Sequence, residues 1–199
     1  LYTILDITDQ ALKDALAETC DHQSFIARAP MVLVFCADCK KWYDAYREAG
    51  CDPRAPGVGD LMLAFSDAAI AAQNAVVAAE SLGLGSCYIG DIMENCARQR
   101  ALLHLPEYVF PAVMLVFGWP TPQQRERPKP QRCPMAHIVH QNAYRSMDGA
   151  ELRAMLAHNC GARPFEEWCA AFCERKYNSD FSREMTRSVA EYLRQFQRG

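Results

Sequence analysis

A stretch rich in arginine, lysine and proline, Arg125 to Arg132, has the residue types that bind a phosphate group. Three arginines and one lysine fall within these eight residues. An arginine donates a two-pronged hydrogen bond to a phosphate, whereas a lysine acts as a point charge. The prolines on both sides of Lys129 stiffen the segment, which lowers the entropy lost on binding. Solvated linkers carry similar charge runs, and charge count alone favours a linker here.

The ten cysteines could in principle perform thiol redox chemistry or bind zinc. Cys36 and Cys39 form a C-x-x-C pair, but a structural zinc site needs four ligands and no second pair follows. Cys169 and Cys173 are four residues apart in a helical apolar pattern. Because a thiol within an apolar run behaves as a small hydrophobic side chain, we expect both pairs to pack in the core. This cysteine usage indicates a reducing cytoplasm.

The histidines offer a second set of candidate metal ligands. His137 and His140 form an H-x-x-H pair, with His158 and Cys160 farther along. We expect His137 to His140 to be extended, and no nearby acidic residue completes a metal site. The sequence therefore predicts no bound metal. It also contains no P-loop, G-x-S-x-G or G-x-G-x-x-G motif.

Strands and helices alternate along the chain in the pattern that must position these residues. The segment Met31 to Cys36 is apolar throughout, which is typical of a strand covered on both faces. Helical patterns separate the strands, and this order favours a sheet flanked by helices. Apolar runs of strand length predict strands at Tyr2 to Ile7, Met31 to Cys36, Ser86 to Ile89 and Pro111 to Phe117.

The segment from Leu61 to Leu82 is rich in Ala, Leu and Val, and it is long enough to span a membrane. Asp67, Gln73 and Asn74 lie near its middle, where polar side chains are costly in lipid. We therefore expect a central helix that is buried in protein on nearly all sides. The glycines that follow, Gly83 and Gly85, are typical of a helix end.

Composition excludes several classes of protein. The chain has 199 residues, of which 50% are hydrophobic and 23% charged, with a net charge of −3. These values fit a folded domain and exclude a mainly disordered or collagen-like chain. The charge gives no reason to expect nucleic-acid or membrane partners. We find no signal-peptide pattern at the start of the chain.

Four stretches of the chain form a recognisable combination. They are Ala71 to Ile92 (AAQNAVVAAESLGLGSCYIGDI), Leu102 to Pro120, Lys129 to Arg132 followed by Val139 to Tyr144, and Arg175 to Val189. Taken together, they resemble the nitroreductase family of FMN-dependent oxidoreductases. The resemblance implies an α+β fold, a three-layer sheet with flanking helices, in an intertwined homodimer with a long buried central helix. It also implies residues 1–145 as the FMN-binding core and residues 146–199 as a C-terminal helical extension of the same domain.

The resemblance also implies which residues contact FMN. Gln23 matches a glutamine at the pyrimidine edge of the flavin ring. The turn Tyr88-Ile89-Gly90-Asp91 matches the segment beside the ring, where a backbone N–H would bond flavin N5 and Gly90 would permit close approach. Lys129 and Arg132 match the basic pair that holds the FMN phosphate, which favours a ligand site over a linker.

Two features depart from the family pattern. The family's N-terminal helix with an Arg-Arg-Ser-x-Arg motif, which contacts the phosphate, is not found in this sequence, and Leu1 to Ile4 matches the strand that follows it. Either the segment lies upstream or the protein lacks it. Asp91 stands where some relatives have glycine. Its carboxylate would disfavour anionic reduced flavin if it points inward, or it caps the next helix.

The function implied by the resemblance is electron transfer through FMN. NAD(P)H would give a hydride to FMN, and a nitroaromatic, quinone or flavin acceptor would take the electrons at the same site by a ping-pong mechanism. No catalytic acid or base is expected, because the cofactor performs the chemistry. Arg175 and Lys176 are candidates for the nucleotide phosphate or simply solvated charges. Alternatives are a specialised relative such as a reductive dehalogenase and a non-catalytic flavin-binding dimer.

Overall fold

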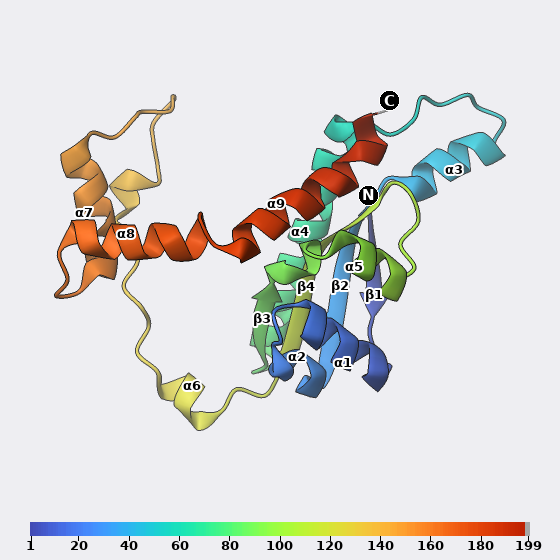
Figure 1. Ribbon diagram of the computed structural model, residues 1–199. Coiled ribbons are helices and arrows are strands. Elements are labelled where there is room, and N and C mark those ends of the chain that lie inside the picture. Colours follow the sequence, from blue (N-terminus) through green and yellow to red (C-terminus); the bar gives the residue numbers. More distant parts are fainter. Residues whose placement is uncertain (198–199) are drawn as a thin grey trace. The chain divides into compact units, whose positions relative to one another are not determined.

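The computed structural model describes residues 1–197 and forms two compact units (Figure 1). Unit 1 comprises residues 1–122 and the chain from Glu184 onward, and it contains the β-sheet. Unit 2 comprises Gln123–Arg183 and is built from helices and loops. Each unit has its own internal contacts.

The sheet of unit 1 has four antiparallel strands in the order β1-β2-β4-β3. The central strands β2 and β4 are the longest, and protein covers both of their faces. Each strand predicted from the sequence is present, which confirms the four apolar runs. The strands are β1 (Tyr2–Asp6), β2 (Met31–Asp38), β3 (Gly85–Ile89) and β4 (Val109–Gly118).

A β-bulge in β4 allows a proline in a central strand. Phe35 pairs with Val113 whereas Cys36 pairs with Pro111, so Ala112 is the extra residue. A proline lacks the N–H of a regular ladder, and a bulge is where a sheet tolerates it. The extra residue also resets the alternation of side chains, so that Ala112 and Leu115 face the same core.

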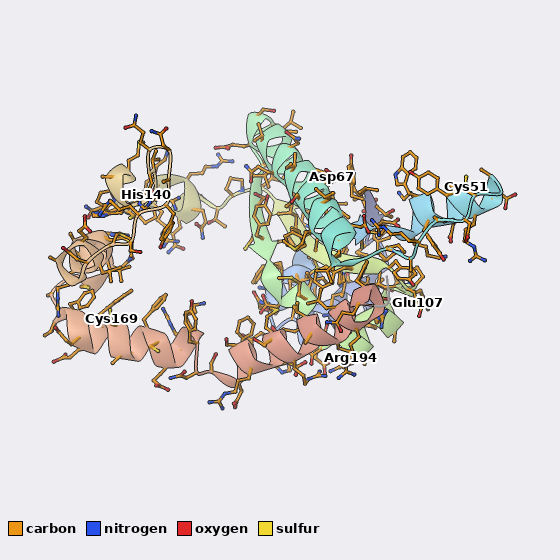
Figure 2. All side chains as sticks on the ribbon, turned by 90° about the horizontal axis from the view of Figure 1, so that it is seen from above. Cys51, Asp67, Glu107, His140, Cys169 and Arg194 are labelled. Atoms are coloured by element: carbon orange, nitrogen blue, oxygen red, sulfur yellow. The ribbon has the colours of Figure 1, made fainter. Side chains whose placement is uncertain are left out.

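One face of the sheet is covered by the long helix α4 (Val58–Ser81) and by the end of α9 (Asp180–Leu193) with the short helix η3 (Arg194–Gln197). Ala64, Ala68 and Ala72 of α4 are fully buried in the same core as Phe35 of β2. Small side chains at every fourth position let this helix approach the sheet closely. Figure 2 shows α4 with Asp67 labelled along its length.

The burial expected for α4 on nearly all sides is not found in this chain. Its outward side exposes Met62, Leu63, Ile70 and Val77, each more than half accessible. Within residues 1–197, α4 is the one helix that length and composition would allow to cross a membrane. Its alanine side packs on the sheet, so α4 forms a layer of the fold in unit 1.

The opposite face of the sheet is covered by short helices. Asp9 caps the first of them, because its carboxylate accepts the Leu12 N–H at 2.7 Å. Together with α4 this makes the predicted three-layer, mixed α+β arrangement (Figure 1). The helices are α1 (Gln10–Thr19), α2 (Ser24–Arg28), the 3₁₀ turn η1 (Gly90–Met93) and α5 (Cys96–Leu102).

Helix α3 (Lys40–Glu48) follows β2 and has no buried residue. An irregular loop follows α3 and leads to α4. A cavity of about 640 Å³ lies against it, lined mainly by Trp42, Tyr43 and Tyr46 together with the loop.

Unit 2 contains α6 (Pro122–Glu126), the 3₁₀ turn η2 (Met135–His137), α7 (Gly149–Cys160) and α8 (Phe165–Lys176). A capping box begins α7: Asp148 accepts the Glu151 N–H at 2.9 Å, and Glu151 accepts the Asp148 N–H at 3.0 Å. On α8, Trp168 stacks on Phe172 with ring centres 4.8 Å apart. The extended form expected for His137 to His140 is wrong, because Ile138 N–H bonds back to the Met135 carbonyl and closes a helical turn.

Candidate functional site

The turn between β3 and η1 presents an exposed glycine at the edge of the sheet. Tyr88 is half-exposed, and its hydroxyl donates to Gln73 Oε1 at 2.9 Å. The next side chain, Ile89, is buried at 2% exposure and anchors the turn in the core. Gly90 follows in an exposed position, and a Cβ placed on it would meet no atom within 4 Å. The backbone at Gly90 is therefore open to a ligand.

Gln23 lies in the turn between α1 and α2, on the face of the sheet that η1 also covers. Its side-chain amide donates to the Cys20 carbonyl at 2.8 Å. The two residues before it, Asp21 and His22, have left-handed backbone angles, with φ of 57° and 53°. This tight turn ends α1 and sets the direction in which Gln23 leaves the helix.

Hydrogen bonds join the end of α1 to the segment that follows η1. Asn95 Nδ2 donates to the Thr19 carbonyl at 2.9 Å, and buried Gln99 donates to the Thr19 hydroxyl at 3.1 Å. Asn95 itself is left-handed at φ 50°, and its N–H donates to Glu184 of α9 at 3.2 Å. These contacts fix the turns that carry Gln23 and Gly90 to the same layer of unit 1.

Acidic side chains lie near Glu94, four residues after Gly90. Glu94 is buried, at 6% exposure, and its Oε1 has no hydrogen-bond partner within residues 1–197. Burial, followed by the charges of Asp91, Asp21 and Glu184, raises the pKa of Glu94 to about 7. The pKa of Glu184 shifts in the opposite direction, because hydrogen bonds from Arg187 lower it to about 2.

This acidic cluster was not predicted from the sequence. Asp91 and Glu94 have the spacing of a helix capping box, and a cap by Asp91 on the next helix was one of the two expectations for this residue. In the structure Asp91 lies inside a 3₁₀ turn, and α5 begins only at Cys96, with no cap from the Asn95 side chain. The D-x-x-E spacing was visible, but nothing local indicated that Glu94 is buried.

The two basic residues expected at the phosphate belong to unit 2. Lys129 and Arg132 are exposed and lie in a segment without helix or strand. In the part of the chain that the structure describes, neither forms an ion pair. Gln23 and the turn from Tyr88 to Asp91 belong to unit 1. The assignment of all these residues to FMN stays a prediction.

The cysteine pairs differ in their surroundings. Cys36 and Cys39 are free and buried, as expected, and burial raises the pKa of their thiols to about 12 and about 11. The expectation that Cys169 and Cys173 both pack in the core is wrong for Cys173, which is exposed on α8. Among residues 1–197, no group of three or more His, Cys, Asp or Glu side chains is arranged to hold a metal ion.

Comparison with known proteins shows which family the chain is similar to. Residues 4–119 match the model of the nitroreductase family. The chain is 38% identical over 146 residues to "Oxygen-insensitive NADPH nitroreductase" of Salmonella typhimurium, covering 73% of this chain and 58% of that protein. It is 30% identical over 192 residues to "FMN reductase [NAD(P)H]" of Bacillus subtilis, covering 96% of this chain and 73% of that protein.

A solved structure agrees with this match. The chain superposes on the NfrA1 nitroreductase of B. subtilis with a TM-score of 0.76 and 26% identity, covering 92% of this chain and 81% of that one. The chain spans about three fifths of the length of the Salmonella relative. A family match across more than half of the chain, with the same layered fold, shows that this chain belongs to the nitroreductase family.

Proposed function

We propose that this protein is an FMN-dependent oxidoreductase that takes electrons from NAD(P)H and passes them to a small-molecule acceptor. The observation that carries the proposal is the open backbone at Gly90, at the end of an edge strand in a chain of the nitroreductase family. Relatives named FMN reductase and NADPH nitroreductase support the choice of cofactor and reductant.

The residues on this chain suit the separate parts of FMN. Open space beside Gly90 leaves room for a flat ring to approach the backbone. Gln23 offers an amide, which both donates and accepts hydrogen bonds, to a pyrimidine edge. Lys129 and Arg132 are exposed cations suited to a phosphate. When bound, FMN supplies hydride and electron chemistry that no amino-acid side chain provides.

The protein's own part in the reaction is to bind and orient. The turn Tyr88-Ile89-Gly90-Asp91 is held by the buried Ile89 side chain and by the bond from Tyr88 to Gln73, so the backbone at Gly90 is preorganised. No side chain is assigned as a catalytic acid or base. One site serves first NAD(P)H and then a nitroaromatic, quinone or flavin acceptor, in a ping-pong order.

The proposal includes a homodimer in the cytoplasm. The outward side of α4 exposes Met62, Leu63, Ile70 and Val77, an apolar surface suited to a second copy of this chain. All ten cysteines are free thiols, which suits a reducing compartment. Within such a dimer, residues 1–145 form the flavin-binding core and residues 146–199 a C-terminal helical extension.

An absorption spectrum of the purified protein tests the proposal. We expect flavin bands between about 350 and 500 nm that bleach when NADPH or NADH is added without oxygen. Bands that persist with both nucleotides would contradict the enzyme and leave a flavin-binding protein. A sample that stays colourless after FMN is added and the excess removed would contradict the cofactor assignment itself.

A further inference from the structure

A cavity of about 450 Å³ lies in unit 1, where the end of α5 and the loop after it meet the end of α9 and η3. Cavities that bind small molecules have volumes of about 300–1,000 Å³. None of the lining residues belongs to the turn at Gly90 or to the turn that carries Gln23. The lining consists of five polar or charged side chains and one leucine: Arg100, Leu105, Glu107, Glu191, Arg194 and Gln195.

Gln195 is the buried polar residue of this cavity, with 7% of its surface exposed. Its Oε1 accepts hydrogen bonds from Arg100 Nη2 at 2.7 Å and from the Tyr108 backbone N–H at 3.0 Å. Its Nε2 is also buried, but it has no hydrogen-bond partner among residues 1–197. A buried donor without a partner costs free energy. An acceptor atom of a bound molecule would remove that cost.

Arg100 is held in place at the cavity but has no counter-ion. Its guanidinium carbon lies 5.5 Å from the centre of the fully buried Tyr192 ring, and its Nη2 is bonded to Gln195. It forms no ion pair in the part of the chain that the structure describes. A guanidinium presents its N–H groups in a planar fork that matches a carboxylate. Arg100 and the unpartnered Gln195 Nε2 are therefore two donors suited to a carboxylate.

Two glutamates supply acceptors to the same cavity. Glu107 is exposed and forms no ion pair within residues 1–197, so Arg100 and Glu107 line one cavity without neutralising each other. Glu191 is paired with Arg194 at 2.6 Å, so these two charges cancel. Figure 2 labels Glu107 and Arg194, which lie at the same end of α9. The remaining carboxylate, Glu107, is suited to an ammonium group.

We propose that this cavity binds a free α-amino acid with an apolar side chain. Arg100 and Gln195 Nε2 bind its carboxylate. Glu107 binds its ammonium group, and Leu105 contacts its side chain. A free amino acid carries both charges on one carbon atom, whereas a peptide carries them at opposite ends. The lining contains two arginines and two glutamates, and this balance suits a zwitterion better than a phosphate or another anion. The site does not depend on the proposed flavin function.

Isothermal titration calorimetry of the full chain with L-leucine tests the proposal. We expect binding with a Kd on the order of 100 μM, as for a small ligand held by a few polar contacts. Two analogues of leucine each keep one of its charges: isocaproate has only the carboxylate, and isoamylamine has only the ammonium group. Each should bind on the order of tenfold more weakly than leucine, because one charged hydrogen-bonding group is lost.

Glu107→Gln tests the ammonium end of the site. It should raise the Kd of leucine on the order of tenfold and leave the Kd of isocaproate unchanged, because isocaproate has no ammonium group. Glu48→Gln is the matched control, because Glu48 is also an exposed glutamate of unit 1 and does not line the cavity. The control should bind leucine like the unchanged protein. Flavin absorbance should be the same in both variants, which separates this site from the proposed flavin function.

Arg100→Lys tests the carboxylate end. It keeps the positive charge but removes the planar fork, so the Kd of leucine and the Kd of isocaproate should both rise on the order of tenfold. Isoamylamine should bind as it does to the unchanged protein. Arg98→Lys, on the same helix and outside the cavity, is the matched control. Circular dichroism shows whether each variant folds, and if Arg100→Lys does not fold, the Glu107→Gln comparison decides.

Three results would overturn the inference. The first is that the unchanged protein does not bind leucine. The second is that leucine binds equally well to the unchanged protein and to Glu107→Gln, which would place the amino acid elsewhere. The third is that isocaproate binds as tightly as leucine, which would mean that the cavity is an anion site without recognition of the ammonium group.

Discussion

The Tyr88 hydroxyl donates a 2.9 Å hydrogen bond to Oε1 of Gln73 and so connects the edge strand β3 to helix α4. β3 pairs with β4 on one side only, and three of its five residues are exposed. An edge strand with so little burial depends on contacts of this kind for its position. Ile89 is the last residue of β3 and Gly90 comes directly after it. The position of β3 therefore determines where the open backbone at Gly90 lies.

Replacing Tyr88 by phenylalanine should weaken this connection without disturbing the core. We expect a loss of about 1 kcal/mol in the free energy of unfolding, the net value of one hydrogen bond at a partly exposed site. Urea unfolding at pH 7 measures it. Tyr144→Phe is the control, because the ring of Tyr144 is 85% exposed. Equal stability of the two variants would mean that the Tyr88 bond contributes nothing net.

Acid stability should depend on Glu184. Hydrogen bonds from Arg187 lower its pKa from 4.5 to about 2, so ionised Glu184 stabilises the fold above the unfolded value. This contribution disappears as pH falls from about 4.5 toward 2. Glu184→Gln should therefore cost about 1 kcal/mol at pH 7, after allowing for solvent screening, and little at pH 2.

Urea unfolding at pH 7 and pH 2 measures the free energy that Glu184→Gln loses relative to the unchanged protein. Glu167→Gln removes an exposed carboxylate on α8 for which no hydrogen bond or ion pair is found in residues 1–197, so its effect should be small at every pH. A Glu184→Gln variant that loses the same free energy at pH 2 as at pH 7 would contradict a role for the ionised carboxylate.

Thiol reactivity should divide the ten cysteines by burial. Cys51, Cys87 and Cys173 are exposed, and we expect them to react with a disulfide reagent before the others. The buried thiols should react only when urea unfolds the chain; they are Cys20, Cys36, Cys39, Cys96 and Cys160. Mass spectrometry of peptides after brief labelling identifies the modified sites. Early labelling of Cys36 and Cys39 would revive the redox interpretation of the C-x-x-C pair.

The phosphate assignment is tested by a matched pair of double variants. Lys129→Ala with Arg132→Ala should release FMN, with a loss of binding on the order of a hundredfold from two charged contacts to phosphate. Arg125→Ala with Arg127→Ala removes the same charge from the neighbouring residues and should retain most of the cofactor. Gel filtration followed by the flavin absorbance gives the amount bound. Equal retention by both double variants would contradict a specific role for Lys129 and Arg132.

Local sequence patterns were enough to predict most elements of this fold. A continuous apolar run such as Met31 to Cys36 predicts a strand covered on both faces, because only such a strand can bury every side chain. The helix starts at Asp9 and Asp148 likewise depend on short-range bonds that these side chains accept from the backbone. Signals of this kind act over a few residues, so they do not depend on the rest of the molecule.

The candidate site was predicted only in part, because signals that act over a few residues do not report which distant segments lie beside them. Family resemblance marked Gln23 and the turn at Gly90, and the structure places both on the η1 side of unit 1. The burial of Glu94 was missed, because the spacing of Asp91 and Glu94 is also the spacing of a capping box. Glu94 is buried where the end of α1 and the start of α9 contact the neighbouring Asn95, and both helices are far away in the sequence.

Local patterns in the sequence were sufficient to predict where the four strands form, that Cys36 and Cys39 are buried, and which family the chain resembles. The strand order β1-β2-β4-β3, the bulge at Ala112, the exposed outer side of α4 and the acidic surroundings of Glu94 depend on contacts between segments that are far apart in the sequence. Periodicity reports which side chains seek burial, but not which surface buries them. A pKa, likewise, depends on charges and solvent exclusion supplied by distant segments, such as Asp21 and Glu184.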